Sequence, residues 1–420
     1  MRQLPLSSAS LLAAAFLLLL SSSAWVEDWG FFGHRRINRL AVFTLPIDLI
    51  PMYKHHIEYL TEHSVDPDKR RYATKHEAVR HYIDLDHWGQ YPFDNVPRTW
   101  SKTLQKYTEF YVRTETGDTL QLVDYQQPRQ TEETIVWKGP ALRSLFGRDS
   151  LLLDADWYGR FFYHNVISQY YEEHWSIAAD SLRKVLERER LPPAIQEIWA
   201  VDRFSEYGIL PYHLVRMQRR LTEAFFQQNG PRILQLSAEI GHYLGDAHVP
   251  LHTTENYNGQ LTNQLGIHAF WESRIPELFA DEEFDYFVGR AEYISQPVDY
   301  YWGIVLESHG YVDSLLQIEQ RLRRSFPEDQ QFCYEERNGR TVRMECRQFA
   351  EAYHRALGDQ VERRMRGAIH AVGSVWYTCW VDAGQPKVSE IFDLEPTSWE
   401  PLPTRPIMRE EDKKNVRPHQ

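Results

Sequence analysis

The sequence predicts an all-α protein, a single large helical domain into which one small β-hairpin is inserted near residues 333–346. Apolar residues recur at helical spacing in most of the long segments, which is the pattern of amphipathic helices. The hairpin is predicted by Asn338-Gly339, a dipeptide typical of tight hairpin turns, between Cys333 and Cys346. The middle of the chain shows no convincing linker, which favours one domain.

The individual helices are predicted from this spacing and from the breaks between segments. Asn229-Gly-Pro231 is a clear break, with Pro231 well placed to begin the next helix, and Leu191-Pro-Pro193 separates two others. Residues 119–136 carry too little periodicity to assign. We expect helices over residues 35–45, 158–186, 210–228, 231–244, 298–326 and 347–380.

The two ends of the chain differ from the rest. Residues 1–24 combine a basic start, an apolar run and small residues ending at Ala24, which is the pattern of a secretory signal. The apolar run is shorter than the roughly 20 residues that span a bilayer. Residues 396–420 are rich in Pro, Glu, Arg and Lys, as disordered tails are. We therefore expect residues 25–395 to form the domain of a secreted or periplasmic protein.

The three cysteines are too few for a disulfide framework. Cys333 and Cys346 can face each other across the predicted hairpin, and an exported protein can hold a disulfide there. Cys379 lies in an aromatic, helix-like run, and we expect it to be a buried, unpaired thiol.

The net charge of −12 argues against a general nucleic-acid binder, which would carry a basic stripe. It does not exclude an enzyme that takes a phosphodiester at a zinc cluster, because the ions bring their own positive charge. Aromatic residues make up 14% of the chain, and some of them could line a groove for bases or acyl chains.

The most informative residues lie between 242 and 272. His242 and Asp246 have i,i+4 spacing, as have His268 and Glu272, so each pair lies on one face of a helix. His252 stands between the pairs, just after a proline. A single pair of this kind is often only a solvated helix face, but a tetrahedral zinc ion takes three or four ligands and five are present. The segment therefore predicts a multinuclear zinc centre and metal-assisted hydrolysis.

Three upstream motifs complete a pattern that resembles the superfamily of zinc-dependent phospholipases C and single-strand-specific nucleases. The resemblance covers most of residues 29 to 275. The spacing from Trp29 to His34 is similar to the nuclease branch, whereas Glu272 in place of aspartate is similar to the phospholipase branch. The motifs are Trp29-Gly-Phe-Phe-Gly-His34, Asp66-Pro-Asp68-Lys-Arg-Arg and His81-Tyr-Ile-Asp-Leu-Asp.

The resemblance implies an all-α fold of the phospholipase C/nuclease type that holds two or three zinc ions. Asp68 stays open as the alternative to Asp66, because Asp-Pro-Asp leaves the register ambiguous by two residues. In the family the tryptophan is the mature N-terminus, but cleavage after Ala24 leaves Trp29 internal, so the third site is the least secure. The implied ligands are Asp66, His81, His242 and Asp246 for one ion, His252, His268 and Glu272 for a second, and His34, Asp246 and the backbone of Trp29 for a third.

The expected mechanism follows from such a centre. Two zinc ions bridged by the carboxylate of Asp246 would lower the pKa of a shared water from 15.7 towards about 7. Asp66 is expected to orient or deprotonate this water. Lys69 and Arg70 are candidate contacts for the substrate phosphate, although a solvated basic turn explains them equally well.

We therefore predict an exported zinc hydrolase that cleaves phosphodiesters, with phospholipids as the leading substrates. The enzyme alternative is a single-strand nuclease with 3′-nucleotidase activity, whose substrate would stack on aromatic side chains. An alternative of another class is a non-catalytic zinc-binding protein. Structural zinc sites are closed, whereas a site of three protein ligands leaves a position for water and favours catalysis. We expect peripheral contact with a membrane at most, and no stable protein partner.

Overall fold

The computed structural model describes residues 31–71, 73–126, 134–167, 176–178, 195–337 and 339–392. The expected signal segment, Trp29 and the expected tail over residues 396–420 lie outside these described residues, so what the sequence predicts of them stays a prediction. Among the described helices, none is long and apolar enough to cross a membrane.

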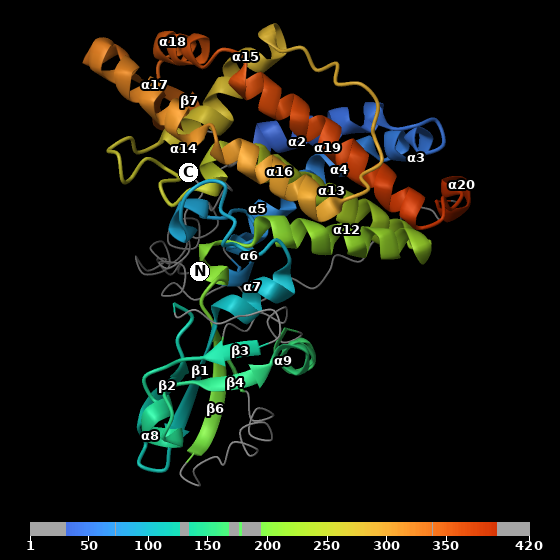
Figure 1. Ribbon diagram of the computed structural model, residues 1–420. Helices are drawn as coiled ribbons and strands as arrows, with labels where there is room; N and C mark the ends of the chain where they lie inside the picture. The colour runs from blue at the N-terminus through green and yellow to red at the C-terminus, as the bar shows by residue number, and fades with distance from the viewer. Residues whose placement is uncertain are drawn as a thin grey trace, which may run out of the picture.

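A large helical body contains most of the molecule, with helix α13 (Gly230–His248) at its centre (Figure 1). Asn229 caps α13 by accepting the backbone N–H of Arg232, and Pro231 occupies the first turn, where no hydrogen bond is lost. Every residue of the helix from Leu236 to its end is buried. A helix that is covered on all sides can hold polar groups only where they find partners in the core.

The other helices of the body surround α13. Its packing neighbours include α2 (Phe31–Ala41), α12 (Leu210–Phe226) and α19 (Gln360–Asp382), and α12 runs antiparallel to it after a short turn. The further helices are α3 (Ile50–His55), α4 (Ile57–Glu62), α5 (Asp66–Arg71), α6 (Lys75–Ala78), α7 (Trp100–Tyr107), α14 (Ile267–Ala269), α15 (Ile275–Glu283), α16 (Pro297–His309), α17 (Val312–Ser325), α18 (Arg347–Leu357) and α20 (Val388–Ile391).

Most of the expected helices are present, but two of them are each divided in the structure. The segments expected over residues 210–228 and 231–244 are the single helices α12 and α13. The segment over 298–326 is α16 and α17, and that over 347–380 is α18 and α19. Gly358, between α18 and α19, has a φ of 64°, which favours glycine and ends a helix. Apolar spacing continues across such a break, so periodicity alone does not reveal it.

The expectation of an all-α fold is wrong for the described residues between 108 and 202, which form a β-module below the helical body in Figure 1. Its main sheet is antiparallel, with strands in the order β2-β1-β6-β5, and a second sheet pairs β3 with β4. The strands are β1 (Thr108–Thr114), β2 (Thr119–Val123), β3 (Thr134–Trp137), β4 (Leu151–Asp154), β5 (Ser176–Ala178) and β6 (Ile195–Asp202), with helices α8 (Leu142–Phe146) and α9 (Ala155–Phe162).

The β-module has its own hydrophobic core, in which Phe110 stacks on Trp137 at 4.9 Å between ring centroids. This explains why the predicted helix over 158–186 is only partly correct. Its first residues belong to α9 and to the π-helical turn that follows, but Ser176–Ala178 pairs with β6. Residues 168–175 and 179–186 lie outside the described residues. Pairing with a strand distant in sequence overrides local helical spacing, because strand preference is set by cross-strand packing.

The expected hairpin is confirmed as β7 (Phe332–Arg337) and β8 (Arg340–Glu345), and Cys333 and Cys346 form a disulfide. Cys379 is a buried free thiol in α19, also as expected. The side chain of Arg274 fixes the hairpin to the body, since its Nε donates to the carbonyl of Glu345 at 3.2 Å.

Candidate metal centre

The centre of the helical body gathers histidine and carboxylate side chains from seven segments. Helix α13 contributes His242 and Asp246 one turn apart, and both are fully buried. His34 approaches from α2 at Gly245, where a Cβ atom would lie only 2.7 Å from its Nδ1. The other residues are Asp68 in α5, His81 after α6, His252 in the 3-10 turn η8 (Pro250–Thr253), His268 in α14 and Glu272 in the π-helical turn η9 (Phe270–Arg274).

These side chains form three groups in which the ligand atoms all lie within 4.8 Å of one another. His242 belongs to two of the groups, so these two adjoin. Every member is buried, and such compact sets of imidazole and carboxylate atoms can hold metal ions. The groups are His34, His242 and Asp246; Asp68, His81 and His242; and His252, His268 and Glu272.

Asp246 lies between the groups and turns one carboxylate oxygen towards each side. Its Oδ2 is 2.9 Å from Nδ1 of His81 and 3.3 Å from Nε2 of His242. Its Oδ1 is 3.5 Å from Nε2 of His34 and 3.9 Å from Nε2 of His252. This arrangement suits a carboxylate that bridges two ions, the role that the resemblance implies for Asp246.

The candidate ligands fit a metal ion because several of their polar atoms are buried without a hydrogen-bond partner. Both ring nitrogens of His34, Nδ1 of His242 and Oδ1 of Asp246 have no hydrogen-bond partner among the described residues. Leaving one such atom buried and unsatisfied costs about 1–3 kcal/mol. A cation coordinated by these atoms would remove that cost. Beside them a cavity of about 30 Å³ touches His34 and Glu272, enough space for a water molecule.

The electrostatics of the site also favour a cation. Burial raises the pKa of Asp246 well above its usual value, and the negative charges of Asp68 and Glu272 raise it further. Burial lowers the pKa of His242, and it lowers that of His252 to about 4. These two imidazoles are therefore neutral at pH 7, the form that binds metal, while the charges of Asp68 and Glu272 oppose ionisation of Asp246.

Hydrogen bonds to the backbone orient two of the candidate ligands. The Nδ1–H of His252 donates to the carbonyl of His81, and the Nδ1–H of His268 donates to the carbonyl of Tyr257 at 3.1 Å. A carbonyl can only accept, so each Nδ1 carries a proton, and the Nε2 atoms of both rings face Oε2 of Glu272, at 3.5 Å from His252 and 2.7 Å from His268. Metal-binding histidines in proteins are commonly held in this way.

The structure corrects one predicted ligand, because it brings Asp68 and not Asp66 into the centre. Oδ1 of Asp68 lies 3.5 Å from Nε2 of His242. The carboxylate of Asp66 instead accepts hydrogen bonds from His63 at 2.6 Å and Lys69 at 2.9 Å, near the surface. Residues two apart on a helix point about 200° apart, so only one of the two aspartates can face inward. The expected role of Asp66 in orienting water falls with its place in the site.

The two candidate phosphate contacts also lie away from the centre. Lys69 pairs with Asp66 at the surface, and Nη1 of Arg70 donates to Glu239 at 2.9 Å. Arg70 also lies 3.6 Å from Glu77. The backbone of Trp29, the expected ligand of the third site, is outside the described residues.

Arg71 is a functional candidate that the sequence reasoning missed. Its side chain is 3% exposed, and Nε and Nη1 have no hydrogen-bond partner among the described residues. Arg71 ends α5, the short helix that carries Asp68 into the centre. Its positive charge acts on two candidate ligands: burial mainly lowers the pKa of His252, and the charge of Arg71 lowers it further, as it lowers that of Asp246. A signal was present, because a residue three positions after Asp68 lies on the same side of α5.

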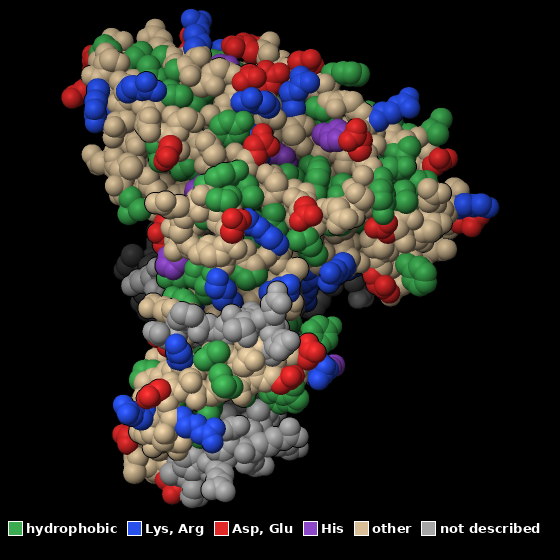
Figure 2. Space-filling view, viewed as in Figure 1, with side chains coloured by type: hydrophobic (Ala, Val, Ile, Leu, Met, Phe, Trp, Pro, Cys, Tyr) green, Lys and Arg blue, Asp and Glu red, His purple; other side chains and the backbone are tan. Residues whose placement is uncertain are grey.

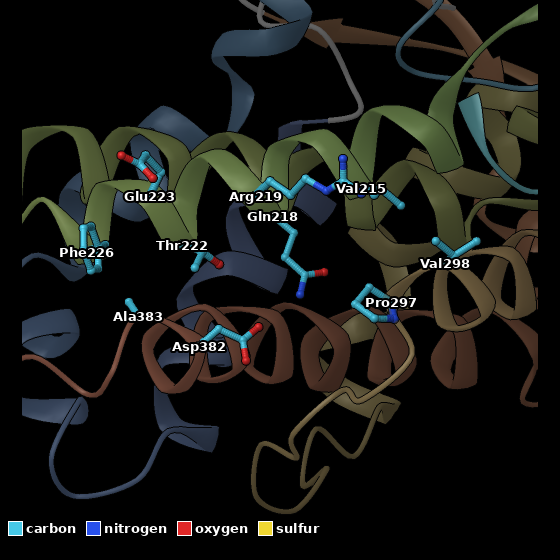
Figure 3. Close-up of a pocket in the computed structure, with 10 residues that line it drawn as sticks. All are labelled: Val215, Gln218, Arg219, Thr222, Glu223, Phe226, Pro297, Val298, Asp382 and Ala383. Carbon is cyan, nitrogen blue, oxygen red and sulfur yellow. The ribbon is translucent and has the colours of Figure 1, made fainter. Parts of the chain in front are cut away.

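A larger cavity of about 510 Å³ lies elsewhere, between α12, the start of α16 and the end of α19 (Figure 3). None of the candidate ligands lines it, so it is separate from the metal centre. Figure 3 shows Thr222 and Gln218 pointing from α12 into the space above Asp382 of α19.

Removal of metal is expected to destabilise the protein, because chelation would leave the carboxylates and unsatisfied imidazoles of the centre buried together. A ligand present at about a thousand times its Kd stabilises a fold by roughly 4 kcal/mol. We expect the melting temperature to fall by roughly 10 °C in calorimetry with a chelator, and to recover with Zn²⁺ but not with Mg²⁺. An unchanged melting temperature, with metal analysis showing that zinc had been removed, would contradict a zinc centre in the core.

A scan against models of known protein families finds no match to the chain, and a search of curated proteins finds no relative.

Proposed function

We propose that this protein is a zinc-dependent hydrolase of phosphodiesters that acts on phospholipids in the manner of a phospholipase C. One observation carries the proposal, the set of eight buried histidine and carboxylate residues that includes Asp246. When bound there, zinc ions supply an acidified water as nucleophile and positive charge for the phosphate. A fold of the phospholipase C/nuclease type belongs to the same proposal.

The residues of the chain divide the work as follows. Asp246 holds the two sides of the centre at a fixed separation, and Asp68 and Glu272 neutralise cations at its edges. His252 and His268 keep their Nε2 atoms turned inward because each Nδ1–H is occupied by a carbonyl. Nε and Nη1 of Arg71 have no partner among the described residues and could donate to two oxygens of the phosphate. Guanidinium groups commonly bind phosphate through two such parallel hydrogen bonds.

A nuclease is the second candidate, and it is favoured by aromatic side chains near His81. The segment after His81 joins Tyr207, whose carbonyl accepts the N–H of Asp84 at 2.7 Å. The rings of His87 and Tyr207 stack at 3.4 Å, and both side chains are partly exposed. Such a pair could receive a nucleic-acid base, since stacking on aromatic rings is worth about 1–3 kcal/mol per base.

The test compares phosphatidylcholine and single-stranded DNA as substrates of the same metal-analysed preparation, with His242→Ala as the control. Cleavage of the lipid that is lost in His242→Ala supports a phospholipase. Cleavage of DNA alone supports a nuclease instead. His242 belongs to two of the three groups, so its loss should remove zinc as well as activity. Neither activity in a zinc-loaded protein would favour the non-catalytic alternative.

A further inference from the structure

The cavity of about 510 Å³ in Figure 3 lies where α12 and α19 both end and where α16 begins. Its volume is within the roughly 300–1,000 Å³ that small-molecule sites occupy. Figure 2 shows hydrophobic and acidic side chains together at the right-hand end of the body, where α12 and α19 end in Figure 1. We call this space the end cavity, and its lining includes Gln218, Thr222, Phe226, Pro297, Val298 and Asp382.

Gln218 reaches into the end cavity with an unused hydrogen-bond donor. Its side chain is 4% exposed, and Figure 3 shows it pointing from α12 into the space above Asp382. The hydroxyl of Tyr301 donates to its Oε1 at 2.5 Å, whereas its Nε2 has no hydrogen-bond partner among the described residues. Burial raises the pKa of Tyr301 well above its usual value, so this hydroxyl keeps its proton. Nε2 is therefore left to the cavity, where an oxygen of a ligand could accept from it.

Two carboxylates line the end cavity without a cation beside them. Oδ1 of Asp382 accepts the hydroxyl of Tyr293 at 2.9 Å, and Glu223 accepts a hydrogen bond from the side chain of Gln227. Among the described residues, no Lys or Arg forms an ion pair with either acid. Arg219 also lines the cavity, but Figure 3 shows its side chain running along α12 rather than towards Asp382. The charge that faces the cavity is therefore negative.

The ends of the two helices add to this negative potential. Phe226 is the last residue of α12, and Asp382 is the last residue of α19. The final carbonyls of a helix carry about half a negative charge, which a basic side chain in the last turn commonly offsets. Neither α12 nor α19 has a basic residue in its last turn. Asp382 therefore adds its charge to an end that is already negative, and a bound cation would stabilise this arrangement.

Apolar side chains enclose the end cavity on two sides. Figure 3 shows Phe226 and Ala383 on one side of the space, and Pro297 and Val298 on the other. The side chain of Phe226 is 71% exposed, so its ring is open to a ligand. Aromatic faces attract ammonium groups, and aliphatic walls gain from contact with alkyl groups. Hard metal ions prefer six or more oxygen ligands, so this mixed lining favours an organic cation.

We propose that the end cavity binds a small organic cation, an alkylated ammonium that also carries an oxygen. The ammonium group lies near Asp382 and Phe226, and its oxygen accepts a hydrogen bond from Nε2 of Gln218. None of the candidate metal ligands lines the end cavity. The binding therefore goes beyond the proposed hydrolysis and does not depend on it.

The test is isothermal titration calorimetry of the full chain with choline, which has a trimethylammonium group and one hydroxyl. The comparison ligand is neohexyl alcohol, an uncharged isostere in which carbon replaces the nitrogen. We expect choline to bind and neohexyl alcohol to bind at least about tenfold more weakly, because only choline interacts with Asp382 and Phe226 through its charge. Asp382→Asn should weaken the binding of choline about tenfold, and Phe226→Ala should weaken it about threefold.

The matched control is Asp359→Asn, which removes the same charge beside the other end of α19. That end is roughly 35 Å away at 1.5 Å per residue, too far to act on the cavity through salt solution. Asp359→Asn should leave the affinity for choline unchanged. Equal weakening by the two variants, equal affinity for the two ligands, or no binding of choline would overturn the proposal. So would binding that Asp382→Asn leaves intact, because choline would then bind elsewhere, as at the metal centre.

The contact with Gln218 has its own test. Gln218→Met keeps most of the size of the side chain but removes its donor, and its melting temperature shows whether the protein still folds. It should weaken the binding of choline about fivefold, the effect of one lost hydrogen bond. The binding of tetramethylammonium, which has no oxygen, should not change. Equal weakening of both cations would contradict the contact between Nε2 of Gln218 and the oxygen of the ligand.

Discussion

Asp68→Asn is expected to lose zinc and to lower hydrolysis by about a hundredfold to a thousandfold, whereas Asp66→Asn keeps both. Only Asp68 lies with His81 and His242 in the metal centre, and its carboxylate is 4% exposed. Loss of one charged ligand weakens the binding of a metal ion that stabilises the transition state by several kcal/mol. Each 1.4 kcal/mol of lost stabilisation lowers the rate about tenfold. The readouts are zinc per chain by metal analysis and kcat with the best substrate.

The two variants form a matched pair, because they change the same residue type at positions two apart on one short helix. Asp66→Asn removes only partly exposed contacts with His63 and Lys69, which are worth little in water. Its melting temperature should change by a few degrees at most. Loss of zinc in Asp66→Asn, with zinc retained in Asp68→Asn, would reverse the assignment that the structure makes.

Arg71→Gln is expected to lower kcat by about a hundredfold to a thousandfold while zinc stays bound. The guanidinium is buried near the centre with two unused donor nitrogens, so a phosphate oxygen is the partner that it lacks. Removing one donor that faces charge in a transition state has an effect of about this size. Arg71→Lys should recover part of the loss, because it keeps the charge but not the planar fork.

Arg70→Gln is the control for this experiment, since Arg70 is adjacent in sequence but pairs with Glu239 and Glu77. It should lower stability and leave kcat nearly unchanged. Inorganic phosphate should inhibit Arg71→Gln more weakly than the unaltered protein. If Arg71→Gln lost stability but kept both its kcat and its affinity for phosphate, Arg71 would be structural.

Local sequence predicted those parts of the site that depend on residues close together in the chain. His242 and Asp246 share one helix, and helical spacing is a local property that survives burial. The hairpin and its disulfide were also predictable, because a two-residue turn and flanking cysteines specify the pairing of their own strands. Asp68 could not be separated from Asp66, because the direction of a side chain around α5 depends on how that helix packs.

The β-module shows the same limit at a larger scale. Strand Thr108–Thr114 pairs with strand Ile195–Asp202, which lies more than eighty residues later in the chain. The local sequence of neither segment indicates which strand it pairs with. Whether a segment forms a strand depends largely on the residues of the neighbouring strand. The spacing of apolar residues after α9 therefore suggested a helix, although Ser176–Ala178 pairs with β6 as a strand. The breaks between α16 and α17 and between α18 and α19 were missed because apolar spacing continues through them.

The sequence by itself determined that this chain is mostly helical, that one hairpin is closed by a disulfide, and which histidines were candidates for one metal centre. The tertiary structure alone decided that Asp68 completes the centre and that Arg71 is buried. The reason is physical. Periodicity and turn chemistry act over a few residues, whereas a shared site is made by side chains from distant segments whose directions are set by packing.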